Sequence, residues 1–186
     1  MSDYTTKATP LQLHDLQFEP FLDAAAIRAR VAALGRVIST DYAGKRPLLL
    51  GVLNGAFMFV ADLMRALDID CEVSFVKLRS YDGTQTTGNV ETLLGLDTDI
   101  EGRHVLLVED IVDTGNTLHY FLPDLKQHHP ASVELVALLL KPAALQQPLD
   151  IRYLGFEIEN RFVVGYGLDY NGLGRNLPAL YQLKKA

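Results

Sequence analysis

Three short apolar runs punctuate the chain, at residues 47–53, 105–108 and 133–140, and all are dominated by leucine and valine. Continuous apolar runs of four to eight residues are typical of strands buried on both faces, as in a parallel sheet. A fourth strand is predicted over about residues 72–78. The first 20 residues contain two prolines and predict an irregular or short-stranded lead-in.

Between these runs, apolar residues recur at every third or fourth position, which predicts amphipathic helices. Asp23 is a residue type that caps helices, and it precedes four such positions: Ile27, Val31, Leu34 and Ile38. This helix should end before Gly44. A second helix is predicted over 56–67, after a tight turn at Asn54-Gly55, and a third contains Leu118, Phe121, Leu122 and Leu125. The order strand, loop, helix, strand predicts a doubly wound α/β sheet.

The segment between strand 105–108 and the third helix carries the strongest candidate chemistry. Gly115 allows close approach of a ligand to the main chain, and a helix N-terminus aims free N–H groups outward, so residues 114–117 predict an anion cradle suited to phosphate. Glu109 and Asp110 are adjacent and point to opposite sides of an extended chain; together they could hold vicinal hydroxyls or Mg²⁺. Asp113 is free to act as a general base.

Each of these residues also has an ordinary structural explanation, because acids and threonines are common in turns and helix caps. The combination is harder to explain in that way. Three carboxylates beside a Thr-Gly-x-Thr turn on one buried strand form a costly cluster of like charge in the absence of a ligand. The joint pattern therefore favours a functional site.

Three other features leave alternatives open. The polar segment 82–89 has two glycines and few apolar residues, so it is either a lid over the site or a solvated hairpin tip. Lys141 ends an apolar strand and is either a fixed cationic donor or a side chain that reaches solvent. Phe162 could belong to the core or stack on a base, and Arg175 could bind phosphate or lie on the surface.

Composition narrows the class of protein. The chain has 186 residues, a number ordinary for one domain, and its net charge of −6 argues against a protein whose main role is to bind nucleic acid. The single cysteine, Cys71, excludes an intramolecular disulfide and is expected in a strand. No signal-like or membrane-spanning apolar segment stands out in the sequence, so a cytoplasmic protein without membrane contact is expected.

The run Val-Leu-Leu-Val-Glu-Asp-Ile-Val-Asp-Thr-Gly-Asn-Thr at 105–117 closely resembles the phosphoribosyl pyrophosphate (PRPP) signature of type I phosphoribosyltransferases. Over residues 47–175 the chain resembles the hypoxanthine-guanine members of that family. Aspartic proteases share the Asp-Thr-Gly triplet, but a helix follows here at once, which their site does not have. The resemblance implies one domain over 1–186, with a core at about 47–165 and a small hood from about 1–20 and 150–186.

The resemblance also implies roles on the PRPP side. Glu109 and Asp110 match the ribose-binding acids, Asp113 the acid or base beside purine N7, and residues Asp113, Thr114, Gly115, Asn116 and Thr117 the 5′-phosphate loop. Ser80 and Tyr81 match the start of a catalytic lid. The pyrophosphate site is assigned to Leu53, Asn54, Gly55 and Arg175. Many members carry lysine at the position of Asn54, so this chain lacks one positive charge there.

The purine side is assigned to Lys141 at the 6-oxo group, Phe162 stacked on the base, Val163 through its backbone, and Asp169. Glu109, Asp110 and Asp169 are the implied Mg²⁺ ligands. The implied reaction is transfer of phosphoribose from PRPP to hypoxanthine or guanine, by a homodimer or homotetramer. The alternatives are a xanthine- or pyrimidine-preferring transferase and a PRPP-sensing regulator, and the second would need a basic face.

Overall fold

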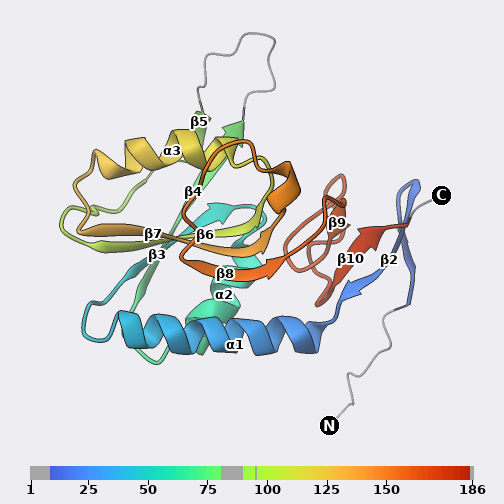
Figure 1. Ribbon diagram of the computed structural model, residues 1–186, viewed down its shortest axis with the longest axis horizontal. Helices are drawn as coiled ribbons and strands as arrows, with labels where there is room; N and C mark the ends of the chain where they lie inside the picture. The colour runs from blue at the N-terminus through green and yellow to red at the C-terminus, as the bar shows by residue number, and fades with distance from the viewer. Residues whose placement is uncertain (1–8, 81–89, 95, 185–186) are drawn as a thin grey trace.

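The computed structural model describes residues 9–80, 90–94 and 96–184. Its centre is a six-stranded sheet in the order β5-β4-β3-β6-β7-β8 (Figure 1). Five strands are parallel, and β5 runs antiparallel to its neighbour β4. The strands are β3 (Leu48–Leu53), β4 (Glu72–Ser80), β5 (Val90–Leu94), β6 (His104–Val112), β7 (Ser132–Leu140) and β8 (Tyr153–Glu157). The predicted α/β class is therefore confirmed.

Helices cover both faces of this sheet, as Figure 1 shows. The helices α1 (Ala24–Asp41) and α2 (Phe57–Ala66) lie on one face, and α3 (Asn116–Lys126) lies on the other. Alternation along β3 divides the core between them, because Leu49 packs with α1 and α2 whereas Leu48 and Leu50 pack with α3. The predicted cap of α1 is confirmed: the Asp23 carboxylate accepts from the Ala26 N–H at 2.7 Å.

A second, four-stranded antiparallel sheet stands beside the carboxyl ends of the parallel strands (Figure 1). It combines β1 (Leu11–Leu13) and β2 (Leu16–Leu22) with β9 (Val163–Val164) and β10 (Leu180–Leu183), so it joins segments from both ends of the chain. Its own small core includes Phe18, Val164, Ala179 and Tyr181. The short strands expected in the lead-in are present.

The structure corrects the predicted elements in two ways. Strand β6 continues beyond the predicted run, because Ile111 and Val112 still pair with Leu139 and Leu140 of β7. Glu109 and Asp110 therefore belong to the strand itself. The sequence analysis also assigned no strand at β5, β8 or β10. In β8 the apolar run is interrupted by Gly155, where a β-carbon would overlap the Leu138 carbonyl oxygen.

Two further expectations have simple outcomes. Cys71 lies immediately before β4, not within it, and packs half-buried against the core under α1 and α2. Among the helices that the structure describes, none is long and apolar enough to cross a membrane. Of the residues predicted for the lid, Ser80 is the last residue of β4, whereas Tyr81 and the polar segment 82–89 lie outside the described residues.

Candidate active site

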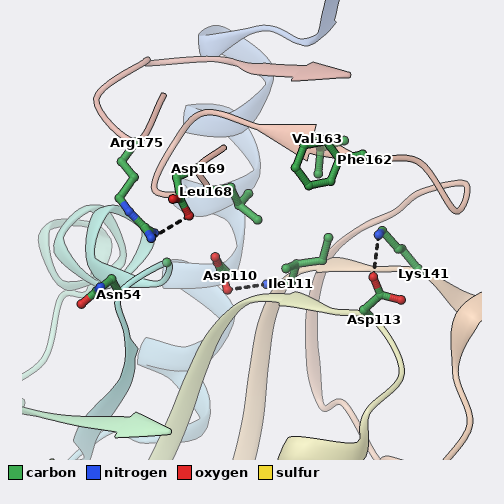
Figure 2. A pocket seen from close by; sticks show the side chains of 11 residues that line it. Asn54, Asp110, Ile111, Asp113, Lys141, Phe162, Val163, Leu168, Asp169 and Arg175 are labelled. Carbon is green, nitrogen blue, oxygen red and sulfur yellow. Dashed lines mark hydrogen bonds and ion pairs between the residues drawn. The ribbon is translucent and has the colours of Figure 1, made fainter. Parts of the chain in front are cut away.

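A cavity of about 330 Å³ lies between the carboxyl ends of the parallel strands and the small sheet. Open parallel sheets bind their ligands at this edge. Strands β3, β6 and β7 lead into one wall, and the segment from β9 to residue 175 forms the other (Figure 2). The lining residues are Asn54, Gly55, Asp110, Ile111, Asp113, Lys141, Phe162, Val163, Leu168, Asp169 and Arg175.

Gly55 is the point of closest packing in this cavity. A β-carbon there would overlap the Oδ2 atom of Asp110, and a β-carbon on Gly167 would overlap the Gly55 carbonyl oxygen. The main chain at Gly55 is therefore held between a carboxylate on one side and the main chain of Gly167 on the other. The preceding peptide bond, Leu53–Asn54, is cis. Only glycine fits at positions 55 and 167 without a displacement of this packing.

Glu109 and Asp110 project to opposite sides of β6, as expected of neighbours in a strand. Asp110 faces the large cavity, whereas Glu109 lines a second cavity of about 100 Å³ beside the N-terminus of α3. Burial raises the pKa of Glu109 well above its ordinary value, and the negative charge of Asp110 adds to this. Burial likewise raises the pKa of Asp110 to about 6. Both acids are held in an environment that disfavours their own negative charge.

One oxygen of this pair stands out. The Oε2 atom of Glu109 is buried and has no hydrogen-bond partner among the described residues. Buried polar atoms are almost always paired in native proteins, so an unpaired one on a residue that lines a cavity indicates a place where a ligand supplies the partner. A ligand hydroxyl or a cation would satisfy it.

The smaller cavity has the features of an anion cradle. Thr114, Gly115 and Thr117 line it, and Gly115 adopts a left-handed φ of 78° at the N-cap of α3. The first N–H groups of a helix are free for a ligand, and the helix dipole favours negative charge there. Asn116 does not line this cavity; its side chain donates instead to Gln146 Oε1 at 3.1 Å. Four of the five residues predicted for the loop, 113–115 and 117, thus line the cradle.

Lys141 and Asp113 form an ion pair of 2.6 Å at the floor of the large cavity (Figure 2). The Lys141 side chain is only 8% exposed, so this ammonium does not reach bulk solvent. The structure therefore excludes the solvent-facing alternative for Lys141. Asp113 is 47% exposed and lines both cavities, which places it between the anion cradle and Lys141.

Phe162 and Val163 line the large cavity from the side of the small sheet (Figure 2). The Phe162 ring is 43% exposed, so it is not a core residue. Its position is supported from behind by two aromatic rings, Phe18 at 6.1 Å and Tyr170 at 5.9 Å between centroids. An exposed ring held in this way offers a flat face to a planar ligand.

Arg175 and Asp169 are paired across the far side of the cavity at 2.6 Å. Arg175 also donates to the Gly167 carbonyl at 2.7 Å, and Asp169 accepts from the Gly172 N–H at 2.7 Å. Part of the hydrogen-bonding capacity of each side chain is thus already used. A phosphate oxygen on Arg175 would add to these contacts or replace the one with Asp169.

The structure does not bring the three predicted metal ligands together. Asp110 and Asp169 share the large cavity, but Glu109 faces the other one. In the described part of the chain, no group of three or more His, Cys, Asp or Glu side chains is placed to hold a metal ion. The donor set still suits Mg²⁺ bound mostly by ligand oxygens, because this ion needs only one or two protein carboxylates.

Two cavity residues were not singled out from the sequence, Ile111 and Leu168. Ile111 reads as part of the buried strand, and only its position after Asp110 could have indicated that it reaches the cavity. Leu53 was predicted at the pyrophosphate site but does not line the cavity with Asn54 and Gly55.

Comparison with known proteins finds related sequences and structures. The family model of the phosphoribosyl transferase domain matches residues 19–171. The chain is 42% identical to the hypoxanthine-guanine phosphoribosyltransferase of Mycobacterium avium, over 98% of the chain and 97% of that protein. It is 43% identical to the bifunctional protein TilS/HprT of Listeria monocytogenes, of whose length it spans 24%. A hypoxanthine phosphoribosyltransferase structure from Staphylococcus aureus superimposes with a TM-score of 0.86 at 38% identity, covering 89% of the chain and 91% of the other.

Proposed function

The chain belongs to the phosphoribosyltransferase family, and from this premise we propose that it is a purine-salvage enzyme. It transfers the 5-phosphoribosyl group of PRPP to N9 of hypoxanthine or guanine, which gives IMP or GMP and pyrophosphate. One observation carries the proposal: a buried cation, Lys141, an exposed ring, Phe162, and a carboxylate, Asp113, line one cavity that adjoins an anion cradle. The whole of 1–186 acts as one transferase domain, with the small sheet as its hood.

The purine lies between the Phe162 ring and the Lys141–Asp113 pair. An ammonium can only donate hydrogen bonds, so Lys141 favours a 6-oxo group and opposes the 6-amino group of adenine. Stacking on Phe162 holds the plane of the base. Val163 follows Phe162 in the cavity lining and contacts the edge of the same base through its main chain. Asp169 also lines this cavity.

The phosphoribose lies across the end of β6. The 5′-phosphate occupies the cradle of Thr114, Gly115 and Thr117. The ribose hydroxyls pair with the carboxylate of Glu109, in the same small cavity, and with that of Asp110, in the large one. The unpaired Oε2 atom of Glu109 supports this placement, because a ribose hydroxyl would give it the partner it lacks. Positive charge builds on the ribose as the bond to pyrophosphate breaks, and these buried carboxylates stabilise it.

Asp113 and Lys141 together control the N7 proton of the base. The carboxylate of Asp113 takes or shares the N7 proton while N9 attacks the ribose. In the free protein this carboxylate is paired with Lys141 at 2.6 Å. Once Lys141 turns to the 6-oxo group, Asp113 is released to face N7. The ion pair therefore keeps both side chains oriented before the base arrives.

Pyrophosphate binds at Asn54, Gly55 and Arg175, with the lid starting at Ser80 and Tyr81. Asn54 supplies no positive charge, so backbone N–H groups and Arg175 carry more of this contact. Asp110 and Asp169, which share the cavity, are the residues that would hold Mg²⁺ together with oxygens of PRPP. When bound, the ion neutralises charge on the departing pyrophosphate. The enzyme acts in the cytoplasm as a homodimer or homotetramer.

The test is nucleotide formation by the purified protein with PRPP and Mg²⁺, offering hypoxanthine, guanine, xanthine, adenine and uracil separately, with a metal-free control. Product from hypoxanthine and guanine alone supports the proposal. Product mainly from xanthine or uracil would instead favour a transferase with a different base pocket. Absence of product from every base, with PRPP still bound, would favour a PRPP-sensing regulator.

A further inference from the structure

Tyr166 lies behind the cavity and takes no direct part in lining it. It stands between Gly165 and Gly167, and all three residues have positive φ, 103°, 47° and 103°. Only the middle one carries a β-carbon, for which this left-handed conformation is unfavourable. A bulky residue in such a conformation indicates that its surroundings hold it there.

The surroundings of the Tyr166 side chain identify what holds it. The ring is 3% exposed, within the core that α1 and α2 share with the sheet. Its hydroxyl donates to Asp62 Oδ2 of α2 at 2.7 Å, and the other oxygen of Asp62 accepts from Arg65 at 2.9 Å. Burial and the Asp62 charge raise the pKa of Tyr166, so the hydroxyl stays protonated and remains a donor.

This contact connects the two walls of the cavity. On one side, α2 begins shortly after the Asn54–Gly55 loop, so Asp62 belongs to the helix that follows the proposed pyrophosphate site. On the other side, the residues after Tyr166 include Leu168 and Asp169 of the opposite wall. Gly167 packs against Gly55 and its carbonyl accepts from Arg175. The hydrogen bond of Tyr166 to Asp62 crosses from the segment of the second wall to the helix of the first.

We propose that Tyr166 is a positioning residue, whose hydrogen bond to Asp62 holds the Leu168–Arg175 segment in register with Gly55 so that the two walls of the cavity form one rigid unit. The proposal rests on the proposed function for its kinetic consequence, since Gly55 and Arg175 are the residues assigned there to the pyrophosphate group of PRPP. The packing of Gly167 on Gly55 alone does not fix the register, because glycine pairs have no side chains to interlock.

The first variant is Tyr166→Phe, which keeps the buried ring and removes only the hydroxyl. Tyr153→Phe is the matched control, because the Tyr153 hydroxyl also donates to a carboxylate, Asp41, at 2.7 Å, but at α1 far along the sheet from the cavity. Both variants lose a hydrogen bond from a hydroxyl to a carboxylate, and Tyr153→Phe also loses the one that Arg152 Nε donates at 3.0 Å. We expect Tyr166→Phe to raise the KM for PRPP about tenfold, the equivalent of 1.4 kcal/mol, with a smaller change in kcat. Tyr153→Phe should leave the KM near the parent value.

Asp62 provides the second arm. Asp62→Asn keeps an oxygen that accepts from Tyr166, so its KM should stay near the parent value. Asp62→Leu removes this acceptor and should reproduce the effect of Tyr166→Phe. The double variant Tyr166→Phe/Asp62→Leu should be no worse than either single change, because both remove one interaction. Additive effects, or equal KM values for Tyr166→Phe and Tyr153→Phe, would overturn the proposal.

Hydrogen exchange of the free protein separates this proposal from the assigned activity. Peptides covering 52–56 and 165–169 should both exchange faster in Tyr166→Phe and in Asp62→Leu, and not in Tyr153→Phe. If the parent forms no nucleotide but this exchange pattern is found, the activity is wrong and the coupling of the walls stands. If exchange at 52–56 is unchanged in both variants, the coupling is wrong whatever the activity.

Discussion

Asp110→Asn should stabilise the protein at neutral pH while it damages catalysis. Burial raises the pKa of Asp110 to about 6 from 3.8. At 1.36 kcal/mol per unit of pKa, this difference of about 2.2 corresponds to about 3 kcal/mol. Asparagine retains the oxygen that accepts from the Ile111 N–H at 2.9 Å, so the contact of Asp110 with the main chain survives.

The sign follows from proton binding. The folded-state pKa is the higher one, so the folded protein binds more protons than the unfolded chain between the two values. The contribution of Asp110 to the free energy of unfolding therefore falls as pH rises from 3.8 to about 6 and stays low above that. The Asn variant has no such loss. Its advantage over the parent should grow through this window and level off at up to about 3 kcal/mol near neutral pH.

Urea denaturation of parent and variant without ligands, at a series of pH values from 4 to 8, measures this difference together with the accompanying change at Glu109, whose pKa the Asp110 charge raises in the parent. Asp97→Asn is a control of opposite sign. The Asp97 carboxylate accepts from Ser74 at 3.0 Å, and that hydrogen bond lowers its pKa, so its contribution is present above the unfolded pKa and lost as pH falls. A difference for Asp110→Asn that is flat with pH, or that destabilises more at pH 8 than at pH 4, would refute the reasoning.

Further changes test the other roles. Asp113→Asn should lower kcat by about 10²-fold or more and leave the Kd for PRPP, measured by calorimetry, nearly unchanged; an unchanged kcat would exclude its role as base. Lys141→Met should lower kcat/KM for hypoxanthine by about ten- to a hundredfold with little loss of Tm, because Asp113 is 47% exposed and water can replace the ammonium; a fall in Tm with equal loss for every base would indicate a structural defect instead. Gly55→Ala, which puts a β-carbon against Asp110, should weaken PRPP binding far more than hypoxanthine binding in calorimetry; equal effects would contradict the assignment of Gly55. Removal of divalent ions with EDTA should abolish turnover, and Mg²⁺ should restore it; turnover that survives chelation would contradict the role proposed for the ion.

Local sequence patterns predict those elements of the fold whose own residues carry the signal. The apolar runs of β3 and β7 and the three- and four-residue spacing of α1 locate these elements to within a residue or two. Strands β8 and β10 carry weaker signals, because each is short, and β10 is stabilised by a partner distant in sequence. In β10, for example, Tyr181 pairs with both Pro20 and Val164. Such pairings depend on the assembled sheet and cannot be read from either segment alone.

The same distinction holds for the site: parts formed by one continuous segment are predictable from sequence, and contacts between different elements are not. The cradle at 113–117 is one continuous segment, so its sequence reveals it, although the contact of Asn116 with Gln146 could not be foreseen. The ion pair of Lys141 with Asp113 and the packing of Gly167 on Gly55 join residues from different elements. The resemblance to a known family indicated which residues matter, and the structure supplies how they contact one another. It also places Glu109 and Asp110 in different cavities, in agreement with the opposite sides predicted for neighbours in an extended chain.

The direction in which the pKa of a carboxylate is shifted distinguishes acids that stabilise the fold from acids that serve the site, without reference to any motif. Asp41 and Asp97 lie away from the cavity, and each accepts from a neighbouring hydroxyl, Tyr153 or Ser74, that lowers its pKa. Those contacts stabilise the ionised acid and thereby the fold. At the cavities the direction reverses, because burial raises the pKa of both Glu109 and Asp110 and too few donors compensate. A fold gains nothing from a pair of acids held in this state, whereas a ligand that brings hydroxyls or a cation recovers the lost stabilisation on binding.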